Sequence, residues 1–190
     1  MIPIMPPTRR KTRTYDHPPL TRRAALSFAG LMVAGPLVLT ACGKSDDAAP
    51  TADVGSPAAV TSIDGRQVSL PAAGKPTAVF FFSVGCGECV GGVRSLGEAA
   101  ASAEANGTGA GFLAVDMDPR ETKETIEGFM KYVEAERVPA AIDQGATLSQ
   151  RFDVAALSTL IIVDSDGRVT FRATDPDAET IIGELEKAGA

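Results

Sequence analysis

The sequence contains no tryptophan and a single histidine, His17, among its 190 residues. Histidine is the commonest metal-binding side chain and the usual base beside a catalytic cysteine. Because no histidine follows residue 17, the sequence argues against His-dependent zinc or copper sites and against Cys–His nucleophilic catalysis. We therefore expect no metal site and no cofactor.

Basic residues are scarce after the first 41 positions. Six of the 18 Lys and Arg residues lie within residues 1–41, together with one of the 24 Asp and Glu residues. The rest of the chain therefore carries a formal net charge of −11. An acidic body without a basic patch argues against nucleic acid as a partner.

Residues 1–41 have the pattern of an export signal that is removed from the mature protein. Basic residues precede an apolar run over residues 24–40, which at about 17 residues is marginal for a membrane-spanning helix. Arg22 and Arg23 resemble the twin-arginine export motif. The alternative is an ordinary secretory signal in which the two arginines only orient the segment.

The apolar run ends in Leu39-Thr40-Ala41-Cys42, which resembles the bacterial lipobox. By that resemblance Cys42 becomes the first mature residue and carries a lipid; a chance cysteine after an ordinary cleavage site is the alternative. Residues 42–58 are rich in Ala, Asp, Pro, Ser and Gly and are expected to form a flexible tether. These features predict a lipoprotein held at the extracytoplasmic face of the bacterial cell membrane.

The two other cysteines, Cys86 and Cys89, follow an apolar run, residues 78–82, that predicts a buried strand. Positions from Val90 onward predict a helix. We expect Cys86 where the strand ends and the helix begins, because backbone N–H groups there favour a thiolate. Cys89 lies within one turn and can close a disulfide with Cys86. A Cys-x-x-Cys pair in this position indicates redox chemistry.

Hydrophobic periodicity and turn residues predict the remaining elements. We expect strands at 60–63, 66–70, 111–115, 139–143, 159–163 and 168–172, and helices at 90–106, 121–136, 146–152 and 176–187. Asp-Gly turns are expected to join the first two strands and the last two strands into hairpins. This order predicts an α/β fold with a mixed central sheet flanked by helices.

That order, with Cys-x-x-Cys after the first central strand, resembles the thioredoxin fold. The motifs flanking the core narrow the resemblance to the membrane-anchored TlpA/ResA-like thiol–disulfide oxidoreductases: Asp64-Gly65-Arg66, Ala141-Ile142-Asp143, Arg151-Phe152-Asp153-Val154 and residues 160–167. The resemblance covers residues 59–190. It implies a thioredoxin-like three-layer sandwich with an N-terminal β-hairpin extension. It also implies protein disulfides as substrates and a membrane thiol as electron donor.

In the reductase interpretation Cys86 attacks a substrate disulfide as a thiolate, and Cys89 resolves the mixed disulfide. Glu88, between the two cysteines, opposes the thiolate by like-charge repulsion. We therefore expect a more reducing pair than those of oxidases that carry a histidine between the cysteines.

The chain departs from the family pattern at three positions. Gly85 stands where the family has tryptophan, and Phe80 stands where thioredoxins keep a buried acid, which leaves Glu88 as the nearest proton acceptor for Cys89. Ser158 stands where the family has its cis-proline, and we expect a trans bond there because a cis bond before serine costs about 3–4 kcal/mol. The residues expected to line the substrate site are Gly85, Gly87, Leu157, Ser158 and Thr159.

Several alternatives stay open. A peroxiredoxin-like peroxidase shares the fold, and Ser83-x-x-Cys86 is similar to its Thr-x-x-Cys motif. A redox-inactive binding lipoprotein with a static disulfide is another alternative, and half a metal site a further one. Glu88 is equally explained as a solvated acid at a helix start, while Asp116 and Asp118 are most simply a turn and a helix N-cap.

Overall fold

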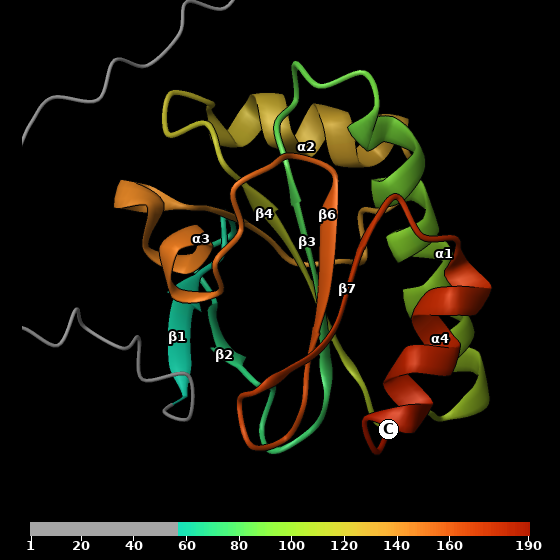
Figure 1. Ribbon diagram of the computed structural model, residues 1–190. Helices are drawn as coiled ribbons and strands as arrows, with labels where there is room; N and C mark the ends of the chain where they lie inside the picture. Colours follow the sequence, from blue (N-terminus) through green and yellow to red (C-terminus); the bar gives the residue numbers. More distant parts are fainter. Residues whose placement is uncertain (1–56) are drawn as a thin grey trace, which may run out of the picture. The chain divides into compact units, whose positions relative to one another are not determined.

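A five-stranded mixed sheet forms the centre of the molecule, seen almost edge-on in Figure 1. The computed structural model describes residues 57–190; the predictions for residues 1–41 and for most of the tether lie outside this range. The strands are β3 (Thr77–Phe82), β4 (Gly111–Asp116), β5 (Ala140–Ile142), β6 (Thr159–Val163) and β7 (Val169–Thr174). They lie in the order β5-β4-β3-β6-β7, with β3, β4 and β5 parallel and β6 and β7 antiparallel to their neighbours.

Strand β3 lies at the centre of the sheet, and all six of its side chains are buried. Its residues alternate between two separate hydrophobic clusters. Phe80 and Phe82 point to one face of the sheet, while Val79 and Phe81 point to the other. A strand covered on both faces requires the continuous apolar run that the sequence shows.

Helices α1 (Cys89–Asn106), α2 (Lys123–Tyr132) and α4 (Ala178–Lys187) pack on the face of Phe80 and Phe82. The ring of Phe129 in α2 stacks on Phe82 with 5.2 Å between ring centroids. The opposite face carries α3 (Thr147–Arg151) and the antiparallel hairpin of β1 (Ala58–Thr61) and β2 (Gln67–Leu70). Figure 1 shows α1 and α4 on one side of the sheet and α3 with the hairpin on the other. This confirms the predicted thioredoxin-like three-layer fold.

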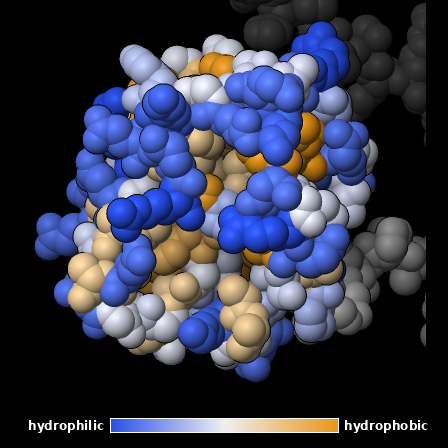
Figure 2. Space-filling view, turned by 180° about the vertical axis from the view of Figure 1, so that it is seen from behind, coloured by the Kyte–Doolittle hydropathy of each residue, from blue (hydrophilic) through white to orange (hydrophobic). Residues whose placement is uncertain are grey.

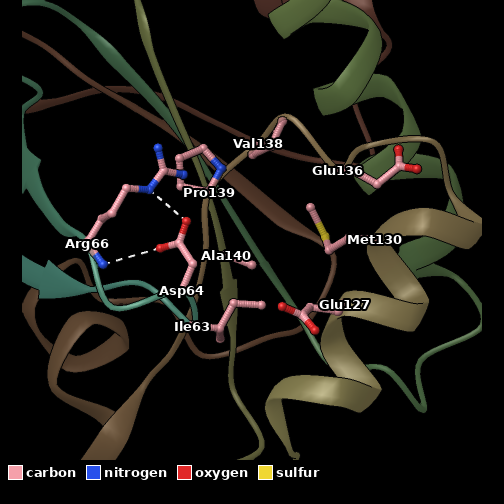
Figure 3. Close-up of a pocket in the computed structure, with 9 residues that line it drawn as sticks. All are labelled: Ile63, Asp64, Arg66, Glu127, Met130, Glu136, Val138, Pro139 and Ala140. Carbon is pink, nitrogen blue, oxygen red and sulfur yellow. Dashed lines mark hydrogen bonds and ion pairs between the residues drawn. The ribbon is translucent and has the colours of Figure 1, made fainter.

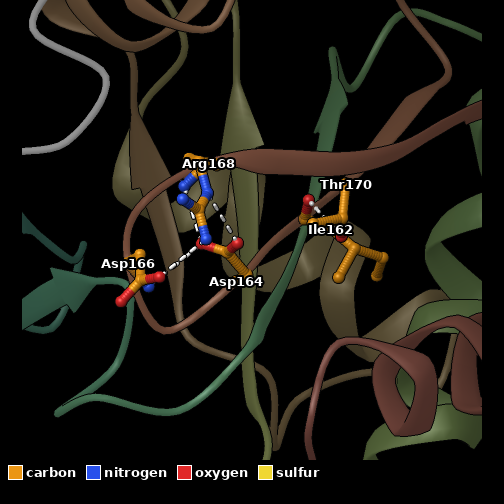
Figure 4. Close-up of polar contacts among 5 residues, drawn as sticks. All are labelled: Ile162, Asp164, Asp166, Arg168 and Thr170. Atoms are coloured by element: carbon orange, nitrogen blue, oxygen red, sulfur yellow. Dashed lines mark hydrogen bonds and ion pairs between the residues drawn. The ribbon is translucent and has the colours of Figure 1, made fainter.

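The two predicted Asp-Gly hairpin turns have a shared construction. In the β6–β7 turn, Asp164 Oδ1 accepts the backbone N–H groups of Asp166 and Arg168 at 3.0 and 2.8 Å. The Arg168 guanidinium forms ion pairs with the carboxylates of Asp164 and Asp166 (Figure 4). In the β1–β2 turn, Asp64 accepts the backbone N–H of Arg66 at 3.2 Å and pairs with its guanidinium. Gly65 and Gly167 both have φ of 85°, a conformation that glycine adopts at little cost.

Several predicted boundaries were wrong. The first hairpin has a loop over residues 62–66 instead of a two-residue turn, because Ser62 forms an isolated bridge to Ala141 at the edge of β5. Helix α2 is shorter than the predicted 121–136. It begins after Thr122, whose side chain accepts the backbone N–H of Thr125, and it ends at Tyr132, shortly before Glu134 adopts a left-handed φ of 61°.

One face of the described domain is mostly hydrophilic. Figure 2 shows this face, where apolar residues appear mainly at the bottom of a hollow between hydrophilic side chains. Among the described residues, the large apolar side chains that are exposed are Tyr132 and Leu157. Within the same range, no helix combines the length and the apolar character needed to cross a bilayer.

Candidate active site

Cys86 and Cys89 lie at the turn between β3 and α1, as the sequence predicts. The backbone N–H of Cys86 donates to the Ser83 carbonyl at 3.0 Å, and α1 begins at Cys89. The two cysteines form a disulfide with 5.3 Å between their Cα atoms, inside the usual range for a disulfide. The pair therefore sits at the carboxyl end of the central strand and at the amino end of a long helix.

The two sulfur-bearing residues differ in exposure. Cys89 is completely buried in the cluster under α1, whereas Cys86 is partly exposed between the exposed residues Gly85 and Gly87. The Sγ of Cys86 accepts the backbone N–H of Cys89 at 3.2 Å. A sulfur that accepts an N–H at a helix amino terminus is stabilised when it carries negative charge. The geometry thus fits Cys86 as the attacking sulfur and Cys89 as the resolving one.

Glu88 occupies the N-cap position of α1, and its side chain makes no capping hydrogen bond. Glu88 is exposed, whereas the adjacent Cys89 is buried. This arrangement favours the interpretation of Glu88 as a solvated acid at the helix start. Its role as proton acceptor for Cys89 stays a prediction that the geometry does not favour.

Ser158 stands in the predicted substrate loop, and its peptide bond to Leu157 is trans; among the described residues the cis bond is Leu70–Pro71. Ser158 has a left-handed φ of 60° and is buried. Its hydroxyl donates to Asp175 Oδ1 at 2.6 Å, and the Asp175 backbone N–H donates to the Ser158 carbonyl at 3.1 Å. The loop is thus held by Asp175, a residue that the sequence analysis missed because it lies 17 positions away.

The side chain of Asp175 also reaches α1. A Cβ atom added at Gly92 would lie 2.8 Å from Asp175 Oδ1 and would collide with the ring of Phe80. The glycine thus allows the ring of Phe80 to lie directly against the helix, one turn after Cys89. A Cβ atom added at Gly91 would have no neighbour within 4 Å, so the constraint applies to Gly92 and not to the residue before it.

A surface groove of about 380 Å³ opens beside the cysteine loop. We call it the Leu157 groove; its lining residues are Ser83, Met117, Asp118, Pro119, Arg120 and Leu157. Leu157 is 38% exposed there, whereas Ser158 and Thr159 are buried and do not line the groove. Of the three residues predicted from this loop, Leu157 is therefore the one that lines the groove.

The opposite wall of the Leu157 groove was not predicted from the sequence. Arg120 donates to Asp118 through both Nε and Nη2, at 3.0 and 2.8 Å, and these bonds lower the pKa of Asp118 to about 2. Asp118 also accepts the backbone N–H of Arg120, so the prediction of a turn was right. The prediction of a helix N-cap was wrong, because Thr122 caps α2.

Asp116 is a second residue that the sequence analysis did not assign to the site. It ends β4, is completely buried, and accepts the backbone N–H of Asp118 at 2.7 Å. Burial is the main reason that its pKa is raised to about 6; the nearby charges of Glu121 and Asp118 add to the effect. A carboxylate at the end of an otherwise apolar strand was the available sequence signal.

Comparison with known proteins agrees with this geometry. A profile of the Redoxin family matches residues 44–190. The chain belongs to the Redoxin family. It is 52% identical over 151 residues to a Streptomyces lividans protein named mercury resistance operon ORF3, covering 80% of this chain and 77% of that one.

Two further proteins are similar to this Redoxin-family chain, one in sequence and one in fold. Thiol-disulfide oxidoreductase ResA of Bacillus cereus is 28% identical over 129 residues, which cover 67% of each chain. The exposed lipoprotein thioredoxin Etrx1 of Streptococcus pneumoniae superposes with a TM-score of 0.59 at 18% identity, over 70% of this chain and 99% of that one. With the disulfide between Cys86 and Cys89, these findings identify a thioredoxin-like thiol–disulfide oxidoreductase.

The Redoxin domain has a further pocket of about 230 Å³ that contains none of the predicted site residues. Figure 3 shows it between the β1–β2 turn and α2, with the ion pair of Asp64 and Arg66 on one side and Glu127 and Met130 on the other. Neither cysteine lines this pocket. Within residues 57–190, no cluster of three or more His, Cys, Asp or Glu side chains is arranged to hold a metal ion.

Proposed function

We propose that this chain is a lipid-anchored, extracytoplasmic oxidoreductase that reduces disulfides in proteins. The observation that carries the proposal is the unequal burial of the pair: Cys86 is accessible at the amino end of α1, and Cys89 is buried behind it. Such an arrangement lets one sulfur meet a macromolecular disulfide while it protects the second from direct attack by solvent oxidants.

The proposed reaction has two exchange steps. The Cys86 thiolate attacks one sulfur of the substrate disulfide; an S–S bond to Cys86 forms, the substrate S–S bond breaks, and the leaving substrate sulfur takes the electron pair. Cys89 then attacks Cys86, which forms the Cys86–Cys89 disulfide and releases the second substrate thiolate. The pair loses two electrons and the substrate gains them, so a thiol donor in the membrane must reduce the pair again.

The Leu157 groove supplies a place for the substrate chain. It adjoins Ser83, whose carbonyl accepts the backbone N–H of Cys86, and it presents an exposed apolar side chain at Leu157. Because Asp175 holds the backbone of Ser158 in a fixed conformation, Leu157 is presented without a cis-proline. An extended segment with an apolar side chain next to its cysteine is the substrate that this groove fits.

Lipid anchoring and the extracytoplasmic location rest on residues 1–58 of the sequence. The lipobox resemblance at Cys42 supports them, and so does the structural similarity to a pneumococcal protein described as an exposed lipoprotein. A lipid on Cys42 would leave Cys86 and Cys89 as the only cysteines of the mature chain. Loss of the third thiol avoids incorrect disulfide pairing in an oxidising compartment.

A trapping experiment in cells tests the proposal. Cys89→Ser cannot resolve mixed disulfides, so we expect it to accumulate covalent adducts with exported proteins, visible on non-reducing gels and released by dithiothreitol. Cys86→Ser/Cys89→Ser is the matched control and should form none. In a Cys42→Ser background the protein should leave the membrane fraction while its adducts persist. An absence of adducts, or adducts confined to cytoplasmic proteins, would count against the proposed function.

A second candidate function is capture of mercuric ion by the reduced pair. The observation that favours it is the 52% identical relative, which is named for a mercury resistance operon. Thiolates are soft ligands, and Hg(II) could replace the two thiol protons and bind both sulfurs. Titration of the reduced protein with HgCl2 in excess glutathione should consume two protein thiols per ion. Retention no better than that of Cys86→Ser would exclude this function.

A further inference from the structure

Asp116 lies on the same face of the sheet as Cys89. It ends β4 directly opposite Phe82, the last residue of β3 before the cysteine loop. Phe82 and Ala114 both belong to the buried cluster that contains Cys89. Side chains along a strand alternate between faces, so Asp116, two residues after Ala114, points to that same face at the edge where the cysteine loop begins.

The carboxylate of Asp116 contacts the cysteine loop itself. One oxygen, Oδ1, accepts the backbone N–H of Asp118 at 2.7 Å, and the backbone N–H of Val84 also bonds to the carboxylate. Val84 stands two residues before Cys86. The other oxygen, Oδ2, is buried and has no hydrogen-bond partner among the described residues. Buried polar atoms without partners are rare in native proteins, and they often mark a functional group.

The surroundings of Asp116 set its protonation near neutral pH. Burial is the largest influence and raises the pKa of Asp116 to about 6; the carboxylates of Glu121 and Asp118 raise it further, and the N–H groups of Asp118 and Val84 lower it. Of the two acidic neighbours, Asp118 is neutralised in part by its ion pair with Arg120. The β3 neighbour is the ring of Phe82, against which Phe129 of α2 stacks, and the titratable group at the start of α1 on this face is Cys89.

Cys89 must lose a proton before it can attack the mixed disulfide, because the thiolate is the nucleophile. Because Cys89 is completely buried, its side chain has no direct contact with bulk water. Glu88, the acid nearest in sequence, is exposed. The ring of Phe80 packs against Gly92 and offers no acceptor. Asp175, whose side chain reaches the same glycine, is exposed and already accepts the Ser158 hydroxyl. The cysteine therefore needs an acceptor from another element.

We propose that Asp116 is the proton acceptor for Cys89 in the resolving step, an inference that rests on the proposed thiol–disulfide exchange. The proton of the Cys89 thiol passes to the carboxylate as the Cys89–Cys86 bond forms. The bond between Cys86 and the substrate sulfur breaks, and its electron pair leaves with the substrate thiolate. Asp116 is buried as well, so it gives up this proton to solvent only after the substrate departs, in a step separate from the exchange.

Stopped-flow reaction of the reduced protein with the aromatic disulfide DTNB separates the two exchange steps. The first thionitrobenzoate anion appears when Cys86 attacks the reagent, and the second appears when Cys89 resolves the mixed disulfide. Asp116→Asn keeps an oxygen for the N–H groups of Asp118 and Val84 but cannot accept a proton. We expect it to slow the second phase by about 10²-fold at pH 7 and to change the first phase less than about twofold.

Matched variants and the wild-type pH profile define the outcomes. The exposed Asp166 of the β6–β7 turn supplies the control, and Asp166→Asn should leave both phases unchanged. In the wild-type protein the rate of the second phase should rise with pH, with an inflection near 6, the pKa of Asp116. This pH profile tests the inference even if Asp116→Asn does not fold. Three results would overturn the inference. They are an unchanged second phase in folded Asp116→Asn, a wild-type second phase whose rate is flat between pH 5 and 8, and a slower second phase in Glu88→Gln in place of Asp116→Asn. Absence of the first phase in the wild-type protein would instead overturn the proposed function.

Discussion

Cys86→Ser should reduce insulin disulfides at least about 10³-fold more slowly than the wild-type protein. A serine hydroxyl stays protonated at neutral pH and cannot form a mixed disulfide, and the remaining Cys89 is completely buried. Cys89→Ser should behave differently, because its Cys86 is still accessible at the amino end of α1. It should attack at nearly the wild-type rate and then stop after one covalent adduct. Turbidity of reduced insulin measures turnover, and mass spectrometry measures the adduct.

The same two variants distinguish the reductase from the peroxiredoxin-like alternative. A peroxidase would consume hydroperoxide through Cys86 and would keep a sulfenic acid on Cys86 in Cys89→Ser. We expect hydroperoxide consumption to be slow relative to insulin reduction in the wild-type protein. Equal insulin reduction by Cys86→Ser and the wild-type protein would refute the assignment of Cys86. If the cysteine pair is redox-inactive, neither Cys86→Ser nor the wild-type protein will reduce insulin.

The sequence predicted those features of the fold that depend on local patterns. The apolar run of β3 and the two hairpins around Asp-Gly each have a local physical cause, and the structure confirms the buried strand and both hairpins. The position of Cys86 between a buried strand and a helix also follows from neighbouring residues. Helix ends were less predictable: Thr122 and Asp177 cap α2 and α4 through single side-chain contacts, and competing polar residues nearby made those positions ambiguous.

The unpredicted parts of the site are made by residues distant in sequence. Ser158 is held by Asp175 across a hairpin, and the Leu157 groove joins the end of β3 to the loop after β4. These contacts depend on the strand order, since β3 lies between β4 and β6 in the sheet. A sequence alone gives each strand but not the register that brings their ends together.

The contact of Phe80 with Gly92 connects two unusual residues that look unrelated in the sequence. A glycine in the first turns of a helix weakens it by about 1 kcal/mol relative to alanine, and a phenylalanine replaces the buried acid implied by the thioredoxin resemblance. In the structure the ring occupies the space that a side chain at position 92 would need. The two residues are therefore a matched pair, and a buried acid, Asp116, stands on the neighbouring strand β4.

Asp116→Asn should make the oxidised protein more stable than the wild type at pH 8 and about equally stable near pH 4. Burial raises the pKa of Asp116 from 3.8 to about 6 in the folded state. Below pH 3.8 the carboxyl is protonated in both the folded and the unfolded state, and the stabilisation that its raised pKa gives the folded state is fully present there. As pH rises through 6, the folded protein must release a proton that the unfolded chain has already lost, and this stability disappears.

The asparagine side chain does not titrate, so the variant escapes this loss. Two pKa units correspond to about 3 kcal/mol, and the difference in unfolding free energy between variant and wild type should therefore grow by about 2–3 kcal/mol between pH 4 and pH 8. Urea unfolding of both oxidised proteins across this range measures it, and the other carboxylates cancel because both proteins share them. Ser165→Ala, at an exposed position without a titratable side chain, should give a difference that is flat with pH. A flat difference for Asp116→Asn as well would contradict the raised pKa of Asp116 in the folded protein.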